Sequence, residues 1–185
     1  MRRALAGACA LAFAAVLAAG LACGRRERER PVPVAAAAET PRVRLSVELY
    51  FPGERTFLER ERREIETTAL PEDQIAAVVG ALLAGPDDSG LAAVFEQPVE
   101  VGPCYLSPDG VAYVDLRSAD GAPLPGLGST QEIQTVYSLV NSVALNVNDV
   151  RRVVLLWNGT QPATFGGHLD TSLPLAPLRG LAPRG

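Results

Sequence analysis

The sequence predicts an α+β fold, in which a mixed or mostly antiparallel sheet of about five to six strands carries two helices packed on one face. Three observations support this prediction. Residues 43–51 alternate strictly between apolar and polar side chains, and residues 71–83 and 129–146 each carry apolar side chains at helical spacing. A hairpin pattern lies between the two helical stretches. The resulting order along the chain is strand, strand, helix, strand, strand, helix, strand, strand.

The first strand has one buried face, because every second residue in it is apolar. These apolar residues are Val43, Leu45, Val47, Leu49 and Phe51. Pro52 and Gly53 then turn the chain, and residues 57–65 are expected to return as a second strand. Glu59 and Arg63 in this return segment also have the spacing of a helical ion pair, but an edge strand protected by charge accounts for the same residues.

Residues 71–83 are predicted to form the first helix. Pro71 suits the first turn of a helix, and the acidic residues after it face the positive end of the helix dipole. The apolar side chains recur at the spacing that places them on one face. They are Ile75, Val78, Val79, Leu82 and Leu83. Gly85 and Pro86 are expected to end the helix.

Residues 99–106 and 111–116 are predicted to pair as a hairpin through the turn residues between them. Residues 119–128 follow, and their content of Gly and Pro predicts a mobile loop. Ser129 and Glu132 then have the spacing of a capping box, in which each side chain binds a free backbone amide at the helix start. This pattern predicts the second helix.

Residues 152–157 are nearly all apolar, which is typical of a strand in the middle of a sheet that is covered on both sides. Asn158 and Gly159 predict a tight turn after this strand, and residues 161–165 are expected to form a last short strand. An Asn-Gly-Thr glycosylation sequon coincides with this turn, and the turn alone explains it.

An export signal is predicted at residues 1–23. Arg2 and Arg3 precede an uninterrupted run of small and apolar residues, and Cys23 follows that run directly, as in a bacterial secretory signal. The segment resembles a lipoprotein signal, in which the cysteine is diacylated and becomes the first mature residue. The run also approaches the length that spans a bilayer, so an uncleaved anchor and a cleaved, released protein are alternatives. All three place the protein outside the cytoplasm, and the first two anchor it to a membrane on the periplasmic or extracellular side.

The remaining chain divides into a flexible tether at 24–42, one domain at 43–175 and a tail at 176–185. The tether alternates Arg and Glu and then becomes rich in Pro and Ala, a composition that cannot build a core. A domain of this size buries enough surface to need no metal or disulfide for stability. Cys104 is its single cysteine, so an internal disulfide is excluded.

The charge balance argues against nucleic acid as a partner. The formal net charge is −4 at pH 7, and the two arginines of the leader contribute to that value. The mature chain is therefore more acidic still, whereas nucleic-acid-binding domains carry basic patches.

Few residues in the domain suggest chemistry. His168 with Asp170 could form part of a metal site or a catalytic triad, but zinc needs three or four ligands and the two glycines before His168 indicate a turn. Cys104 has no partner histidine or second cysteine, and it is expected to be a buried small side chain. Residues 126–130 could cradle an anion before the second helix, yet they lack the lysine of a phosphate loop. We therefore expect no catalytic, metal or cofactor site.

Several short motifs match one known family in order and spacing. They are LYFP at 49–52, ALLAGP at 81–86, AYVDL at 112–116, YSLVNSV at 137–143 and FGGHLDTSLPL at 165–175. On these residues the chain resembles the GerMN domain of sporulation and spore germination proteins, over about residues 43–174. The sporulation protein carries two such domains in tandem, whereas one fits here.

The resemblance implies a non-enzymatic, extracytoplasmic lipoprotein that acts as a protein–protein interaction or assembly module in the cell envelope. The implied partners are other envelope proteins or further copies of the chain. The exposed edge of the first hairpin and the loop at 119–128 are the expected contact surfaces. A small-ligand or peptidoglycan-binding module is the alternative.

Overall fold

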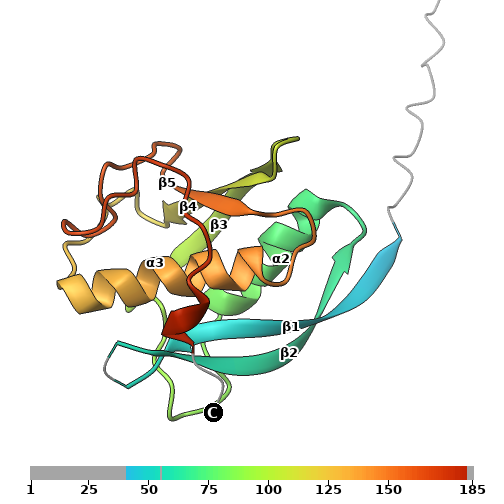
Figure 1. The fold of residues 1–185 in the computed structure, drawn as a ribbon, viewed down its shortest axis with the longest axis horizontal. Helices are drawn as coiled ribbons and strands as arrows, with labels where there is room; N and C mark the ends of the chain where they lie inside the picture. Colours follow the sequence, from blue (N-terminus) through green and yellow to red (C-terminus); the bar gives the residue numbers. More distant parts are fainter. Residues whose placement is uncertain (1–40, 55, 183–185) are drawn as a thin grey trace, which may run out of the picture. The chain divides into compact units, whose positions relative to one another are not determined.

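The computed structural model describes residues 41–54 and 56–182. Cys23, the predicted signal and all but the last two residues of the predicted tether lie outside this part of the chain. The described residues contain five strands, two α-helices and one short 3-10 helix, in the order shown in Figure 1. Their bounds are β1 Arg42–Pro52, β2 Leu58–Thr68, α2 Pro71–Leu83, β3 Val99–Leu106, β4 Val111–Ser118, α3 Ser129–Ala144, β5 Arg152–Trp157 and η1 Arg179–Leu181.

The five strands form two sheets, whereas the sequence predicts a single sheet of five to six strands. β1 and β2 pair antiparallel, and the second sheet has the order β3-β4-β5, with β3 antiparallel and β5 parallel to β4. The α+β class and both hairpins are confirmed. The single sheet is wrong because Ser142 of α3 and Asn146, two residues after the helix, occupy the edge of β1, where another strand would have to pair.

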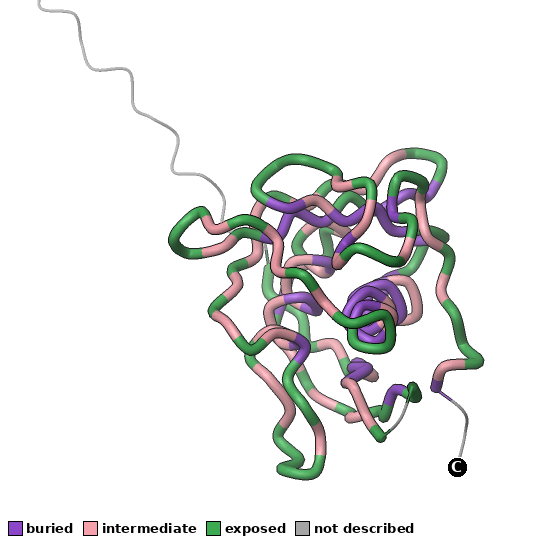
Figure 2. The backbone as a smooth tube through the Cα atoms, turned by 90° about the vertical axis from the view of Figure 1, so that its left-hand side faces the viewer, coloured by how far each residue is buried: buried purple, intermediate pink, exposed green. Residues whose placement is uncertain are grey.

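The two helices lie between the sheets, and not on one face of one sheet as predicted. α2 contacts β2 and β3, while α3 contacts β1 and β5. Figure 1 shows β1 and β2 on one side of the helices and the three-stranded sheet on the other. α3 is consequently buried around most of its surface, and Figure 2 shows its coil mainly in the colour of buried residues.

One hydrophobic core joins both sheets and both helices. β1 contributes Val47, Leu49 and Phe51 to it, with Leu45 partly buried, as the alternating pattern predicts, whereas Val43, predicted for the same face, is exposed near the start of the strand. The fully buried large side chains include Leu49 and Phe51 of β1, Ile75 and Leu82 of α2, Leu116 of β4, Leu139 of α3, Leu155 of β5, and Phe165. Phe95, Trp157 and Phe165 form an aromatic cluster with ring centroids 6.1 to 6.4 Å apart. This shared core fixes how the sheets and helices sit within the domain.

Strand β5 lies at an edge of its sheet, and the central strand is β4. The prediction of a central β5 is therefore wrong. Its apolar residues are nonetheless covered, because α3 packs on the strand and an isolated bridge between Val153 and Leu175 covers its open side. The predicted strand at 161–165 is also wrong: this segment forms only an isolated bridge from Thr164 to Asp170, and Pro162 lacks the N–H that a ladder requires. The tight turn is confirmed, since Asn158 and Gly159 both have positive φ angles, of 50° and 79°.

The residues after Leu175 pack onto the domain as far as they are described. The Asn141 side chain donates to the Leu178 carbonyl at 3.1 Å and accepts from the Leu178 N–H at 2.8 Å. Ala182 is buried beside Tyr50 and Leu58, on the face of β1 opposite the main core. This end of the chain therefore covers part of the first hairpin.

Candidate functional site

The two edges of the β1–β2 hairpin have different surroundings. On β1, the Asn146 side chain accepts a hydrogen bond from the Glu48 N–H at 2.8 Å and donates one to the Glu48 carbonyl at 2.7 Å. Ser142 Oγ accepts from the Tyr50 N–H at 3.0 Å. On β2, no further strand pairs within the described part of the chain. The sequence predicts an exposed edge on the first hairpin, and the structure assigns it to β2.

The three-stranded sheet has less open strand edge that could pair with another strand. β3 contains Pro103, and its register with β4 shifts between Val101 and Cys104. Both features disfavour pairing with another strand. At the opposite edge, the bridge from Val153 to Leu175 covers part of β5. The edge of β2 is therefore the longest regular strand edge that remains open in the described residues.

The outer face of the hairpin is covered by charged side chains of both signs. Four ion pairs form across β1 and β2, with N···O distances of 3.6 to 3.9 Å: Arg42 and Arg44 with Glu66, and Arg60 and Arg62 with Glu48. Most of these side chains are well exposed. Ion pairs of this length and exposure contribute little to folding stability. The outer face thus carries far more charge than the fold requires.

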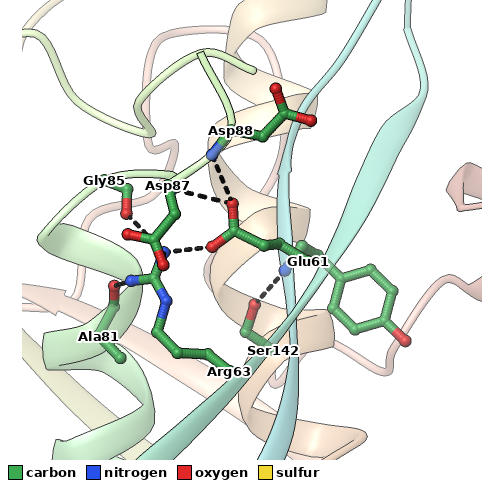
Figure 3. A network of polar contacts seen from close by, with 8 residues as sticks. Glu61, Arg63, Ala81, Gly85, Asp87, Asp88 and Ser142 are labelled. Carbon is green, nitrogen blue, oxygen red and sulfur yellow. Dashed lines mark hydrogen bonds and ion pairs between the residues drawn. The ribbon is translucent and has the colours of Figure 1, made fainter. Parts of the chain in front are cut away.

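The inner face of β2 is tied to α2 by Arg63, as Figure 3 shows. The Arg63 guanidinium donates to the carbonyl oxygens of Ala81 at 2.9 Å and Gly85 at 3.1 Å, at the C-terminal end of the helix. These carbonyls have no partner inside the helix, and a cation is favourable at the negative end of its dipole. Arg63 thereby caps α2, a role that the local sequence of the helix does not reveal.

Glu61 completes this network. Its carboxylate pairs with Arg63 and accepts hydrogen bonds from the backbone N–H groups of Asp87 at 2.9 Å and Asp88 at 3.1 Å. Burial opposes ionisation of Glu61, but the hydrogen bonds from Asp88, Arg63 and Asp87 outweigh this effect, so its pKa is lowered. Glu61 and Arg63 on this inner face therefore both have a structural task.

The loop at 119–128 has no regular secondary structure, as predicted, but it is fixed at several points. Trp157 Nε1 donates to the Ala122 carbonyl at 3.0 Å, and the Asn158 side chain donates to the same oxygen at 3.2 Å. Near its other end, the Leu127 N–H donates to the Gly166 carbonyl at 3.1 Å. The predicted mobility of this loop stays a prediction.

Two adjoining hollows lie beside this loop. The larger has a volume of about 390 Å³, and its walls are mostly Pro and Ala side chains from residues 97–98 and 118–125. The smaller, of about 180 Å³, lies between residues 94–97 and 125–131. Ligand pockets usually have volumes of about 300 to 1,000 Å³, so the larger hollow lies at the lower end of this range and the smaller one below it.

Glu132 has a different role from the one predicted. No side-chain cap is present at the start of α3, where Gly128 is the N-cap residue, so the capping box is wrong. The fully buried Glu132 carboxylate instead accepts from the N–H groups of Gly166 at 2.6 Å and His168 at 2.7 Å. Burial opposes its ionisation, but the hydrogen bonds from the backbone at Leu169, His168 and Gly166 dominate and lower its pKa.

His168 belongs to this structural contact. Its Nδ1 lies 3.3 Å from the Glu132 carboxylate, and about half of its side chain is exposed. Asp170 does not join it; the Asp170 carboxylate accepts hydrogen bonds from Ser172 instead. Within the described residues no three His, Cys, Asp or Glu side chains are grouped as metal ligands would be.

Cys104 is half-buried on β3, where its Sγ lies 3.8 Å from the Gly102 carbonyl. Burial, and secondarily the negative charge of Asp115, raises the pKa of the Cys104 thiol to about 11. The thiol is therefore protonated near neutral pH, in which state it is a poor nucleophile.

Residues 126–130, which could cradle an anion but lack the lysine of a phosphate loop, span the end of the loop and the start of α3. The Glu132 N–H already donates to the Gly128 carbonyl at 2.8 Å, and the buried Glu132 carboxylate lies one turn into the helix. A negative charge at this position opposes a second anion at the same helix end.

In the described part, no helix has both the length and the apolar character needed to cross a membrane.

Several solved structures share this fold. The first GerMN domain of the sporulation protein GerM from Bacillus subtilis matches with a TM-score of 0.54 and 17% identity, over 74% of this chain and 98% of that one. A candidate lipoprotein from Clostridium perfringens matches with a TM-score of 0.52 and 18% identity, over 78% and 95% of the two chains.

The tandem GerMN domains of the same Bacillus subtilis protein match with a TM-score of 0.52 and 16% identity, over 81% of this chain. The match covers 51% of the tandem structure, so this chain spans about half of its length.

A search among curated proteins gives no match. The family model described as Germane, sporulation and spore germination, matches residues 48–163. That match covers more than half of the chain and confirms the resemblance drawn from the sequence motifs, so the chain belongs to the Germane family.

Proposed function

We propose that this chain is a non-enzymatic extracytoplasmic module that binds other proteins of the cell envelope. The observation that carries the proposal is the β2 edge: eleven residues of regular strand with no strand beyond them in the described part, flanked by charged side chains that contribute little to the fold. Strand edges bind proteins by extending the sheet, with main-chain hydrogen bonds giving affinity.

The charged groups that are buried support the same proposal. Glu61, Arg63 and Glu132 each bind backbone groups of a neighbouring segment, and the Cys104 thiol is protonated near neutral pH. These polar groups serve the structure. The buried charged groups are thus bound internally, whereas the exposed ones lie along a strand edge. Exposed charges in such a place are suited to recognition of other proteins.

Crosslinking in living cells tests the proposal. A photoreactive amino acid at position 64 of β2 is expected to yield specific crosslinked products with envelope proteins, identified by mass spectrometry. The same group at the exposed Asn148, after α3, is the matched control. Products that are equal at both positions, or none at position 64, would count against the β2 edge as the binding surface.

Membrane anchoring through Cys23 is part of the proposal. The supporting observations are the signal-like segment before it and the candidate lipoprotein from Clostridium perfringens among the structures that share the fold. Cys23→Ala is expected to move the protein from the membrane fraction to the soluble fraction. An unchanged distribution would favour an uncleaved anchor.

Peptidoglycan binding is the second candidate function. Tyr105 and Tyr113 lie opposite each other on β3 and β4, with 55% and 36% of their surface exposed and ring centroids 6.1 Å apart. Exposed aromatic faces can pack against the apolar face of a sugar. If this function holds, the protein cosediments with purified peptidoglycan and the Tyr105→Ala, Tyr113→Ala double variant does not. An interaction module without this function stays in the supernatant.

A further inference from the structure

The direction of the β2 backbone groups follows from the contacts of β1. The backbone groups of Glu48 and Tyr50 bind Asn146 and Ser142, at the C-terminal end of α3 and just after it, and thus point away from β2. In an antiparallel pair, residues opposite each other both direct their backbone groups toward the partner strand or both away from it. Arg62 and Arg60 lie opposite Glu48 and Tyr50. The even-numbered residues of β2 therefore direct their N–H and C=O groups to the open edge.

The side chains at these even positions have an ordered charge sequence. Along the edge they are Arg60, Arg62, Glu64 and Glu66, all exposed. The first half of the edge is positive and the second half is negative. An antiparallel copy of the strand presents the same charges in the opposite order. The positive half of one copy therefore lies opposite the negative half of the other.

From this complementarity we propose that β2 pairs antiparallel with β2 of a second copy, on a two-fold axis that passes through Arg63. This inference rests on the proposed function and names the partner. In this register Arg62 lies opposite Glu64 of the second copy, and Arg60 lies opposite Glu66 of the second copy. The symmetry repeats both pairs, so four pairs of opposite charge flank a continuous four-stranded sheet.

Neighbouring registers are unfavourable. An axis at Arg62 places Arg62 opposite its own copy, and an axis at Glu64 does the same with two carboxylates. Axes at Glu61 or Ile65 place Arg60 opposite Arg62, or Glu64 opposite Glu66. Like charges directly opposite each other destabilise a strand pair. Charges of a single sign would repel in every register, as in edges that avoid pairing, whereas this charge order selects one register.

The rest of the strand is compatible with the pairing. β2 contains no proline, so its N–H groups are complete along the edge. Arg63 would lie next to its own copy on the axis, but its guanidinium is bound by Glu61 and by the Ala81 and Gly85 carbonyls of its own chain. The present partners of Arg62 and Glu66 lie at 3.7 Å and 3.6 Å and are exposed, so these side chains can share a second partner at little cost.

A single strand pair buries less surface than a permanent dimer needs, so the dimer is expected to be reversible and weakened by salt. Sedimentation velocity of the full chain in mild detergent, over a concentration series up to several hundred micromolar, would detect it. The expected result is a monomer–dimer equilibrium whose dissociation constant rises by about tenfold or more when salt is raised from low to high ionic strength.

Charge reversals test the register. Arg62→Glu alone and Glu64→Arg alone each place like charges opposite each other twice, and each variant is expected to be monomeric. An equimolar mixture of the two variants restores opposite charges at all four central positions and is expected to form heterodimers. Arg152→Glu, at an exposed position on β5 in the other sheet, changes the net charge as Arg62→Glu does and is expected to dimerise normally. Circular dichroism confirms that each variant is folded.

Three outcomes would overturn the inference: a native chain that stays monomeric over the whole series, single variants that dimerise like the native chain, or a mixture that does not associate. The proposed function is judged separately by the crosslinks from position 64. If those crosslinks reach a different envelope protein while the purified chain stays monomeric, the interaction function stands and the self-pairing of β2 is wrong.

Discussion

Charged side chains have different tasks in two regions of this domain. At the start of α3, Glu132 is fully buried, and its two oxygens bind the backbone of the segment at 166–168. On the outer face of the first hairpin, charged side chains are exposed and contact one another at 3.6 to 3.9 Å. The first region holds chain segments together, whereas the second adds little to stability. Burial and backbone partners, more than the number of charges, therefore distinguish structural charge from charge available for recognition.

The strongest test of this difference is Glu132→Ala. The substitution removes the acceptor of two backbone N–H groups and leaves a small cavity, so the free energy of unfolding is expected to fall by about 3 kcal/mol. Urea denaturation measures the change. Glu100→Ala, at an exposed position on β3, is the control and is expected to change stability by less than about 0.5 kcal/mol. Equal losses in both variants would remove the distinction between the regions.

Arg62 and Arg63 allow the same comparison within one strand. Arg63→Met removes the cap of α2 and leaves Glu61 without its ion-pair partner, and we expect a loss of about 2 kcal/mol. Arg62→Met keeps a similar side-chain length at an exposed neighbour and is expected to cost less than about 0.5 kcal/mol. Both values come from the same denaturation experiment. A larger loss for Arg62→Met would mean that the outer charges also stabilise the fold.

Asn146 extends the comparison to an uncharged side chain. Asn146→Ala removes two hydrogen bonds to Glu48 and opens the edge of β1, with an expected loss of about 1.5 kcal/mol. Asn148→Ala, two residues later and exposed, is the matched control and should be nearly neutral. Faster hydrogen exchange of the Glu48 amide in the Asn146 variant alone would locate the effect at the strand edge.

The smallest expected effect is the pH dependence from Glu132. Its pKa is lowered in the folded chain, whereas the pKa of a glutamate in an unfolded chain is about 4.3. Between the two pKa values the unfolded chain binds more protons, so this contribution to stability is complete above about 4.3 and is lost as the pH falls through the folded pKa. Denaturation measured from pH 6 to pH 3 should show the decline, and Glu132→Gln should flatten it. An unchanged slope in that variant would assign the decline to other carboxylates such as Glu61.

The sequence predicts the elements of this fold well where a local pattern determines them. The alternation at 43–51, the apolar spacing at 71–83 and the Asn158-Gly159 turn each depend on neighbouring residues, and each is confirmed. The pairing of strands into sheets depends on contacts between distant residues. Asn146 closes the edge of β1 at Glu48, 98 residues away in the sequence, and no local pattern predicts that contact.

The same limit applies to the candidate site. Ser129 and Glu132 have the spacing of a capping box, but the Glu132 carboxylate binds a segment that lies 34 residues farther along the chain. The charge density of β2 did predict an edge strand, because charged side chains at alternate positions tolerate exposure on a pleated surface. Which hairpin edge is open could not be predicted, since it depends on the position of α3.

The parallel pairing of β4 with β5 has a consequence for the order in which the chain acquires its structure. Parallel strands need a crossover, and here residues 119–151, with α3 among them, must be placed before β5 can join its sheet. The two hairpins close over short stretches of chain and are expected to form first, because closing a long loop costs more entropy. In pulse-labelled hydrogen exchange during refolding, amides of β1 and β2 should be protected before those of β5. Protection of β5 first would contradict this order.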